Sequence, residues 1–156
     1  MNILSVYCHD NPKSLTASLK NVAVGELERQ GHTVIETDLY ASAFNPVATK
    51  LDFTYLSGGH YNYLLEQKNT SVNGHLFSPD IMGEIEKVAH SDIIIIHMPV
   101  WWFGPPAILK GWFDRVFAMG VTWDAGKTFS KGLLKNKSVM ITATSGFPEA
   151  FYKKDG

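Results

Sequence analysis

Three short stretches of the sequence carry residue types that could bind a ligand. Residues 9–16 (HDNPKSLT) hold a histidine, a lysine and two hydroxyls, residues 99–103 (PVWWF) hold three consecutive aromatic rings, and residues 144–147 (TSGF) hold two hydroxyls and a glycine. Hydroxyls beside the free N–H groups of a helix N-terminus favour a phosphate. An aromatic turn that cannot bury every ring favours a flat conjugated ligand.

Each stretch also has a purely structural explanation. Ser14 is a preferred residue for capping a helix, whether or not a phosphate binds. One of the two tryptophans in residues 99–103 could pack beneath the following helix, and the other could lie in a dimer interface. The run Thr-Ser-Gly is a weak signal on its own, although its glycine lets the backbone approach a ligand closely. The sequence alone leaves both explanations open.

The elements that must position these stretches alternate between strands and helices. Residues 2–8 form a β-rich apolar run, and helical spacing follows through Leu15, Leu19, Val22, Ala23 and Leu27. Gly31 is expected to end this helix, and residues 32–40 alternate into a second strand. The first 40 residues therefore predict a βαβ unit.

A second series of elements follows further along the chain. Ser78 is expected to cap a helix with Pro79 at its first position, and the all-apolar run 92–97 predicts a strand that is covered on both faces. Pro105 and Pro106 begin a helix with a wide apolar stripe, in which Gly111 allows a close approach. Residues 138–144 predict the fourth strand.

Between these two series, residues 41–77 show no clear hydrophobic period. Asn45-Pro46, Gly58-Gly59 and Asn73-Gly74 mark turns, so a long excursion is expected, with a helical piece near residues 52–56. The alternation elsewhere predicts a single α/β domain over residues 1–156, with a doubly wound parallel sheet and helices on both faces. The three ligand-binding stretches then meet at the carboxyl ends of the strands.

Composition and charge narrow the class of protein. The formal net charge of −1 gives no electrostatic reason to expect nucleic acid or an anionic membrane as a partner. The apolar runs are too short for an integral membrane segment, and the N-terminus shows no leader pattern, so a cytoplasmic protein is expected. Cys8 is the single cysteine and is expected to pack in the core. No Cys/His spacing indicates a metal site.

The quoted stretches resemble a known family. Residues 1–19, DLYASAFNPVATKLDF, GHLFSPDI and above all PVWWFGPPAILKGWFDRVF are similar to the flavodoxin-like NAD(P)H:quinone oxidoreductases of the DT-diaphorase and modulator-of-drug-activity type. The resemblance covers nearly the whole chain. It implies a flavodoxin-like fold and a homodimer that holds flavin at its interface, usually FAD, with FMN also possible. It further implies two-electron transfer from NAD(P)H to a small-molecule quinone.

The resemblance also implies roles for individual residues. Those at the flavin phosphate are His9, Ser14, Leu15 and Thr16, with Ser18 nearby, and those at the flavin ring are Pro99, Val100, Trp101, Trp102 and Phe103. Thr144, Ser145 and Gly146 match the loop that binds the polar edge of the ring, although only part of the family's Thr-Thr-Gly-Gly run is present. Tyr152 is expected at the position of the family's catalytic tyrosine, with Phe151 as the alternative by one residue. The histidine that follows in the family is absent.

The same resemblance implies further elements beyond this sequence. The family fold continues with a helix, a fifth strand and a closing helix, whereas this sequence stops at Gly156. The C-terminal strand and helix are thus missing from it. We expect either a truncated product or a partner subunit that covers the open edge of the fourth strand.

Other functions remain open from the sequence. A regulatory subunit of a glutathione-gated potassium efflux system is the main alternative, because related flavin domains bind such transporters; they generally lack an excursion like residues 41–77. A small electron carrier is disfavoured by the near-neutral charge. A truncated chain that keeps the fold but binds no flavin is the alternative without a function. The sequence selects neither NADH nor NADPH.

Overall fold

The computed structural model describes residues 1–74, 76–127, 129–132 and 134–153. Its sheet contains β1 (Asn2–Tyr7), β2 (Thr33–Asp38), β3 (Ile93–Pro99) and β4 (Ser138–Thr144). All neighbours are parallel, in the order β2-β1-β3-β4. The chain moves to one side of β1 for β2 and to the other side for β3. This reversal creates a crevice between the carboxyl ends of β1 and β3, where open α/β sheets bind ligands.

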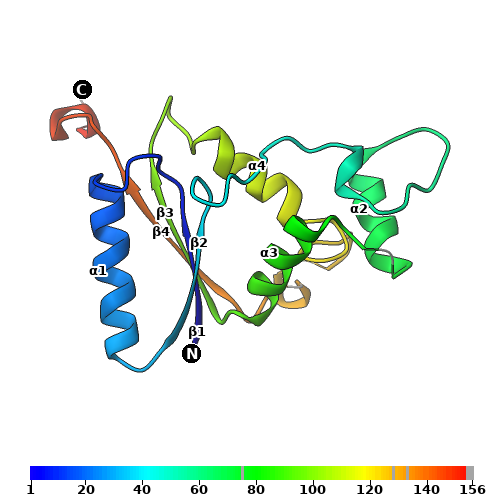
Figure 1. Ribbon diagram of the computed structural model, residues 1–156, viewed down its shortest axis with the longest axis horizontal. Helices are drawn as coiled ribbons and strands as arrows, with labels where there is room; N and C mark the ends of the chain where they lie inside the picture. The colour runs from blue at the N-terminus through cyan, green and yellow to red at the C-terminus, as the bar shows by residue number, and fades with distance from the viewer. Residues whose placement is uncertain (75, 128, 133, 154–156) are drawn as a thin grey trace.

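Helices cover both faces of the sheet, as the alternating pattern predicted. Figure 1 shows α1 (Leu15–Arg29) on one face and both α3 (Pro79–His90) and α4 (Ala107–Val116) on the other. The short helix α2 (Tyr63–Val72) lies beyond α4, away from the sheet. Three 3₁₀ turns complete the described elements, at Lys50–Asp52, Phe129–Lys131 and Glu149–Tyr152. The arrangement confirms the doubly wound α/β prediction.

The main core lies between the sheet and the pair α3 and α4. Leu4, Val6, Ile94 and Ile96 face Trp112 there, and all five side chains are at most 2% exposed. Burying one such side chain contributes about 1.5 to 3 kcal/mol. Because β1 and β3 are covered on both faces, the apolar run that predicted β3 is explained.

The helix α1 was predicted correctly, but its apolar spacing does not mark its buried face. Leu15, Leu19 and Val22 are 65%, 43% and 73% exposed, whereas Thr16 and Ala17 are buried against the sheet. The sheet face that α1 covers carries polar side chains, such as Thr144, which bonds to Thr16. Small and polar side chains of α1 therefore fit against it. Gly31 ends the helix as expected, with a φ of +83° that favours glycine.

The starts of α3 and α4 also follow the predicted positions. Ser78 precedes α3 and Pro79 occupies its first turn, but the Ser78 hydroxyl donates to Asp80 (2.5 Å) instead of capping the backbone. Gly111 in α4 lies against Pro46, and a Cβ added to Gly111 would stand 2.2 Å from the Pro46 carbonyl oxygen. The predicted close approach at Gly111 is confirmed.

The excursion of residues 41–77 differs from its prediction. The 3₁₀ turn Lys50–Asp52 shares only Asp52 with the helical piece expected near residues 52–56, and α2 was not predicted. The sequence hides α2 because its inward side chains are the polar Glu66, Gln67 and Thr70, while its leucines are exposed. A helix buried through polar side chains shows no apolar period.

A buried arginine on α4 joins this excursion to the rest of the fold. The Arg115 guanidinium donates to both Asp52 oxygens (3.0 and 3.2 Å), to Asp80 (2.7 Å) and to the Asn45 carbonyl (2.8 Å). The Tyr63 hydroxyl donates to Asp52 as well (2.7 Å). Arg115 and Asp52 are 3% and 1% exposed. Every charge in this group is paired, so its burial is tolerated.

The edge strand β4 is the most exposed part of the sheet. Within the described ranges β4 pairs only with β3, and Val139, Met140 and Ile141 are each about half exposed, at 54%, 48% and 54%. The expected open edge is therefore observed for these residues. Figure 1 shows the chain leaving β4 at its carboxyl end, above the start of α1.

Candidate functional site

Hydrogen bonds and ring contacts bring the three predicted stretches together at the carboxyl edge of the sheet. The Thr16 and Thr144 hydroxyls lie 2.7 Å apart, the His9 and Trp101 rings meet edge to face at 5.7 Å, and Val100 donates its N–H to the Thr144 carbonyl (2.8 Å). Residues from the ends of β1, β3 and β4 thus share one rim, as predicted.

His9 follows β1 and stands at the centre of this rim. The Asn11 N–H donates to His9 Nδ1 (3.0 Å), and in this bond Nδ1 is the acceptor, so the ring proton lies on Nε2. The Asp10 carboxylate is also 3.1 Å from Nδ1, but that nitrogen cannot donate to Asp10 while it accepts from Asn11. With the Asn11 bond in place, the Nε2–H of His9 can donate to an anionic ligand.

The start of α1 offers the features expected of a phosphate site. Ser14 caps the helix by accepting from the Ala17 N–H (3.1 Å), and the first intrahelical bond runs from Ser18 N to the Ser14 carbonyl. The N–H groups of Leu15 and Thr16 therefore have no partner inside the helix. The Ser18 hydroxyl donates to the same Ser14 carbonyl (3.2 Å). Ser14 thus acts as a cap, and the phosphate role rests on these backbone groups.

The Thr16 and Thr144 hydroxyls are committed to each other. Thr16 is 1% exposed, so its side chain faces the sheet rather than solvent. One hydroxyl of the pair must donate to the other, which leaves a single proton for a ligand. This hydrogen bond connects α1 to β4, whether or not either hydroxyl also contacts a cofactor.

The aromatic turn after β3 has a strained backbone. Trp101 and Gly104 exchange two backbone hydrogen bonds (3.0 and 3.1 Å), which closes a two-residue turn with Trp102 and Phe103 at its centre. Their φ angles are +50° and +63°, the left-handed values of a type I′ turn, which Asn-Gly normally occupies. Each such residue costs about 1 to 3 kcal/mol, and strain of this size clusters at functional sites.

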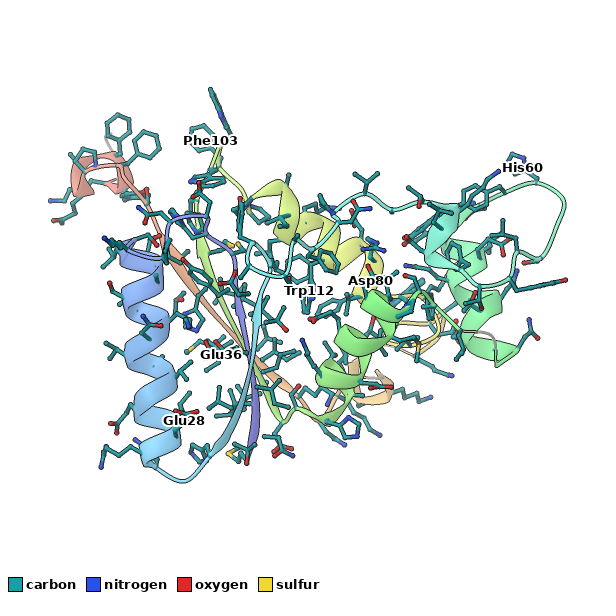
Figure 2. The ribbon with its side chains drawn as sticks, in the orientation of Figure 1. Glu28, Glu36, His60, Asp80, Phe103 and Trp112 are labelled. Carbon is teal, nitrogen blue, oxygen red and sulfur yellow. The ribbon has the colours of Figure 1, made fainter. Side chains whose placement is uncertain are left out.

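The rings of this turn point away from the core. Trp102 is 96% exposed and Phe103 89%, whereas Trp101 is 41% exposed and packs against His9. Figure 2 shows Phe103 at the tip of the connection between β3 and α4. The sequence left open that Trp101 or Trp102 packs beneath α4. Neither does, since both are exposed, and the buried tryptophan at that place is Trp112 of α4 itself.

The backbone of the same turn is only partly available to a ligand. The N–H groups of Val100 and Trp101 donate to Thr144 and Gly104, and Pro99 has none to donate. Among the described residues, nothing accepts from the N–H groups of Trp102 and Phe103. The backbone donors that remain at this turn are therefore those at its tip.

The third stretch joins this turn through aromatic contacts. Ser145 Oγ accepts from the Phe147 N–H (3.2 Å) and hydrogen-bonds to the Tyr152 hydroxyl. The Phe147 ring lies nearly parallel to that of Phe103, at 11° and with centroids 6.3 Å apart. A Cβ built on Gly146 meets no described atom within 4 Å, so the space over this glycine is open. The sequence placed Phe147 in the third stretch but did not predict its contact with Phe103, because no local pattern marks a contact between residues 44 positions apart.

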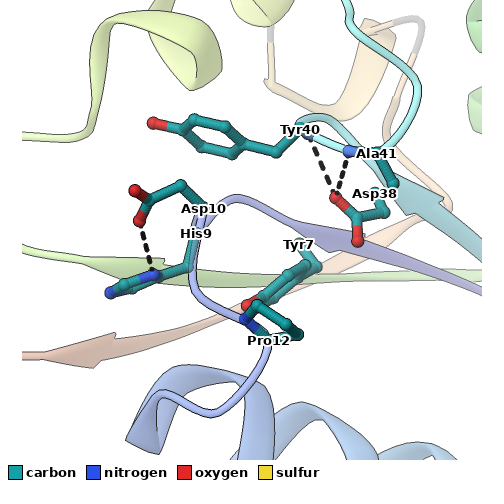
Figure 3. A pocket seen from close by; sticks show the side chains of 7 residues that line it. All are labelled: Tyr7, His9, Asp10, Pro12, Asp38, Tyr40 and Ala41. Atoms are coloured by element: carbon teal, nitrogen blue, oxygen red, sulfur yellow. Dashed lines mark hydrogen bonds and ion pairs between the residues drawn. The ribbon is translucent and has the colours of Figure 1, made fainter.

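A groove opens on the other side of His9, where sequence reasoning placed no site. This cavity has a volume of about 400 Å³ and lies between the ends of β1 and β2, where Figure 3 shows its lining side chains. Its lining residues are Tyr7, His9, Asp10, Pro12, Asp38, Tyr40 and Ala41. Asp38 accepts from the N–H groups of Tyr40 and Ala41 (3.0 and 2.9 Å) and so holds its wall in place. The groove borders the predicted rim without containing the aromatic turn.

Two buried titratable groups lie below the rim. Burial is the main cause that lowers the pKa of His97 to about 4, with nearby Lys20 adding to it and Glu36 opposing it. The neutral His97 ring shares a 2.7 Å hydrogen bond with the Thr142 hydroxyl. Burial, with a smaller influence of Asp38, raises the pKa of the Cys8 thiol to about 12. Cys8 is therefore a core residue, as expected, rather than a reactive thiol.

Two other kinds of site were searched for in the described residues. No three His, Cys, Asp or Glu side chains among them are placed to share a metal ion. None of the helices in the described ranges combines the length and apolar character needed to cross a bilayer.

Comparison with known proteins gives the family. A family model described as "Flavodoxin-like fold" matches residues 1–156. Human ribosyldihydronicotinamide dehydrogenase (quinone) is 44% identical over 156 residues, which cover 99% of this chain and 67% of the human protein. Rat NAD(P)H dehydrogenase (quinone) 1 is 36% identical over 155 residues, covering 98% of this chain and 56% of the rat protein.

A solved structure extends this likeness to three dimensions. A Klebsiella pneumoniae protein proposed to be a quinone reductase superposes with a TM-score of 0.89 at 33% identity, covering all of this chain and 63% of that protein. The chain thus spans roughly two thirds or less of the length of these relatives. Their names lend no support to a potassium efflux subunit. We conclude that the chain belongs to the flavodoxin-like fold family, among the NAD(P)H:quinone oxidoreductases.

Proposed function

We propose that this chain forms the flavin- and quinone-binding part of an NAD(P)H:quinone oxidoreductase. The observation that carries the proposal is the aromatic turn, where Trp102 and Phe103 adopt left-handed backbone angles and remain almost fully exposed. A fold that needed only a connection between β3 and α4 would place Asn-Gly there at lower cost. The family relationship supports the same assignment.

The residues at the rim fit a flavin. The free N–H groups of Leu15 and Thr16, with the helix dipole behind them, suit a phosphate, and Ser14, Ser18 and His9 Nε2 border the same place. The residues from Pro99 to Phe103 would hold the ring, and the open space over Gly146 would admit its polar edge beside Thr144 and Ser145. The rim therefore offers contacts to both ends of FMN or to the flavin half of FAD.

The overall reaction converts NAD(P)H, a proton and a quinone into NAD(P)⁺ and a hydroquinone. When bound, the flavin supplies the hydride chemistry, and the protein positions the reactants and tunes charge. Tyr152 can contribute a hydroxyl to the polar edge of the site. Its hydroxyl donates to Ser145 Oγ beside Gly146, so it could donate to an oxygen that becomes negative once that oxygen replaces Ser145 as its acceptor. We propose Tyr152 as the catalytic residue on this ground.

The finer assignments rest on the family relationship. We propose FAD rather than FMN as the cofactor, a homodimer with flavin at the interface, and a cytoplasmic location. The relatives named above support a dehydrogenase acting on quinones. Solved structures of lower identity include an FMN complex, which is why FMN stays the alternative cofactor.

The test is a visible absorbance spectrum of the purified chain with added FAD or FMN. We expect a bound-flavin band that bleaches with NADPH or NADH under anaerobic conditions and returns when a quinone is added. A folded chain that binds neither flavin would contradict the proposal for this chain. The Trp102→Ala variant should retain its fold, because the exposed ring makes few contacts within the protein. The same variant should bind flavin more weakly or reduce the quinone more slowly.

A further inference from the structure

The ring of His9 has two possible hydrogen-bond partners on one nitrogen. Nδ1 lies 3.0 Å from the backbone nitrogen of Asn11, which donates to it, and 3.1 Å from the Asp10 carboxylate, which can only accept. Nδ1 accepts when its lone pair is free and donates once it carries a proton. The two bonds therefore exclude each other, and the protonation of Nδ1 decides which one forms.

The neutral ring makes one of these contacts unfavourable. With its proton on Nε2, His9 turns the lone pair of Nδ1 towards a carboxylate oxygen 3.1 Å away, and two acceptors repel at this distance. A proton on Nδ1 turns the same contact into a charge-assisted hydrogen bond. The Asn11 N–H then loses its acceptor, but Asn11 is exposed, so water can replace it. The loop can therefore hold His9 in either charge state.

The direction of the His9 ring suits a ligand in both states. Its side chain is only 18% exposed, and the Trp101 ring packs against it edge to face at 5.7 Å. Figure 3 shows the Asp10 carboxylate on the Nδ1 side of the ring, so Nε2 points away from this carboxylate. Nε2 carries a proton both in the ring that accepts from Asn11 and in the imidazolium. It is also the nitrogen assigned to the phosphate under the proposed function.

We propose that Asp10 is a positioning residue through which His9 takes up a proton when the diphosphate of FAD binds. A negative phosphate oxygen beside Nε2 favours the positive imidazolium over the neutral ring. The proton comes from solvent and binds Nδ1, which then donates to Asp10 while Asn11 releases its bond. Histidine is the side chain that changes charge most readily near neutral pH. The inference rests on the proposed function and adds a dependence on pH to the same site.

Other charged and titratable groups surround His9 without taking the place of Asp10. Those that line the groove with it are Tyr7, Asp10, Asp38 and Tyr40. Lys13 on the same loop is an exposed cation, and Lys20 of α1 lies over the Tyr7 ring and pairs with Glu36. Burial is the main cause that raises the pKa of Tyr40, so this phenol stays neutral. Of these described groups, only Asp10 contacts a nitrogen of the His9 ring.

The test measures proton uptake by calorimetry. Titration of FAD into the purified chain near pH 7.5, repeated in buffers of different ionisation enthalpy, gives the number of protons bound per FAD. FAD is the probe because its diphosphate does not titrate near neutral pH, whereas the phosphate monoester of FMN does. We expect the wild type to take up about half a proton per FAD, so that binding weakens about threefold for each pH unit in this range.

Two variants and a matched control isolate the role of Asp10. We expect the uptake to fall to about 0.2 proton or less in Asp10→Asn and to nearly zero in His9→Gln. The Asp10 side chain is 66% exposed, so Asp10→Asn should keep the fold. The control is Asp38→Asn, which removes another carboxylate of the groove. Asp38 binds the N–H groups of residues 40 and 41, so its loss should leave the uptake unchanged.

Several outcomes would overturn the inference and leave the proposed function intact. These are FAD binding without proton uptake in the wild type, equal uptake in Asp10→Asn and the wild type, and an equal loss of uptake in Asp38→Asn. Bound FAD that takes up protons as expected but is not bleached by NAD(P)H would contradict the function and support the inference. A folded chain that binds no FAD would overturn the inference, and bleaching of bound FMN would then test the function on its own.

Discussion

Thr16 at the start of α1 and Thr144 at the end of β4 share a hydrogen bond of 2.7 Å, although 128 positions separate them in the sequence. This bond closes the rim between the expected phosphate site and the expected ring site. Two elements that would each hold one half of a flavin are thereby kept in register.

Replacing Thr16 by valine tests this connection. Thr16→Val leaves the Thr144 hydroxyl without its partner, so flavin binding should weaken about fivefold to tenfold, roughly 1 to 1.4 kcal/mol. Thr16→Ser keeps the hydroxyl and should stay within twofold of the wild type. Flavin titration followed by fluorescence measures both. A double-mutant cycle with Thr144→Val that showed no coupling would mean that the bond has no part in binding.

The strained aromatic turn predicts a trade between stability and function. Replacing Trp102 by asparagine and Phe103 by glycine installs the residues that a type I′ turn prefers, and should raise the free energy of unfolding by about 1 to 2 kcal/mol. The same variant should lose quinone reduction, because both rings are gone. Urea denaturation and a turnover assay give the two answers. A less stable variant would show that the rings support the fold and would remove the argument from strain.

The buried His97 predicts a pH dependence of stability. Its folded pKa is about 4, whereas the unfolded chain takes up this proton near 6.5. The stabilisation that the neutral, buried His97 contributes is therefore fully present above pH 6.5. The free energy of unfolding falls by about 3 kcal/mol in total as the pH drops from 6.5 towards 4. His97→Gln should flatten the curve of unfolding free energy in this window. An equally steep curve in His97→Gln would assign the dependence to other groups.

The Arg115 network predicts a large difference between buried and exposed ion pairs. Arg115→Met leaves the buried Asp52 carboxylate without its main partner and should cost about 3 to 5 kcal/mol. The control is Lys110→Ala, which removes a pair with Asp114 on the solvent side of the same helix and should cost under about 1 kcal/mol. Thermal unfolding of both variants provides the comparison. Similar losses would show that burial does not determine the strength of these pairs.

The sequence predicted those parts of the fold that rest on apolar periodicity or on residues with strong local preferences. The run 92–97 marked β3, Gly31 marked the end of α1, and Gly111 marked a close approach to α4, which the structure shows to be made by Pro46. The helix α2 was missed because its buried side chains, such as Glu66 and Gln67, are polar.

The candidate site was predicted in outline only. The three stretches could be placed at one rim, because parallel strands end at the same edge of a sheet. The left-handed angles of Trp102 and Phe103 could not be predicted, since neither residue type favours them. The stacking of Phe147 on Phe103 and the bond between Thr16 and Thr144 depend on tertiary packing, which no local pattern encodes.

The way Arg115 holds the excursion limits how this protein can recombine with its relatives. The partners of its guanidinium, Asn45, Asp52 and Asp80, lie up to 70 positions before it in the sequence. A chimaera with one crossover point between residues 52 and 115 would separate Arg115 from Asp52, unless the donor sequence carries the same charged groups. Exchanges of the excursion between homologues should therefore succeed only when α4 is inherited with it.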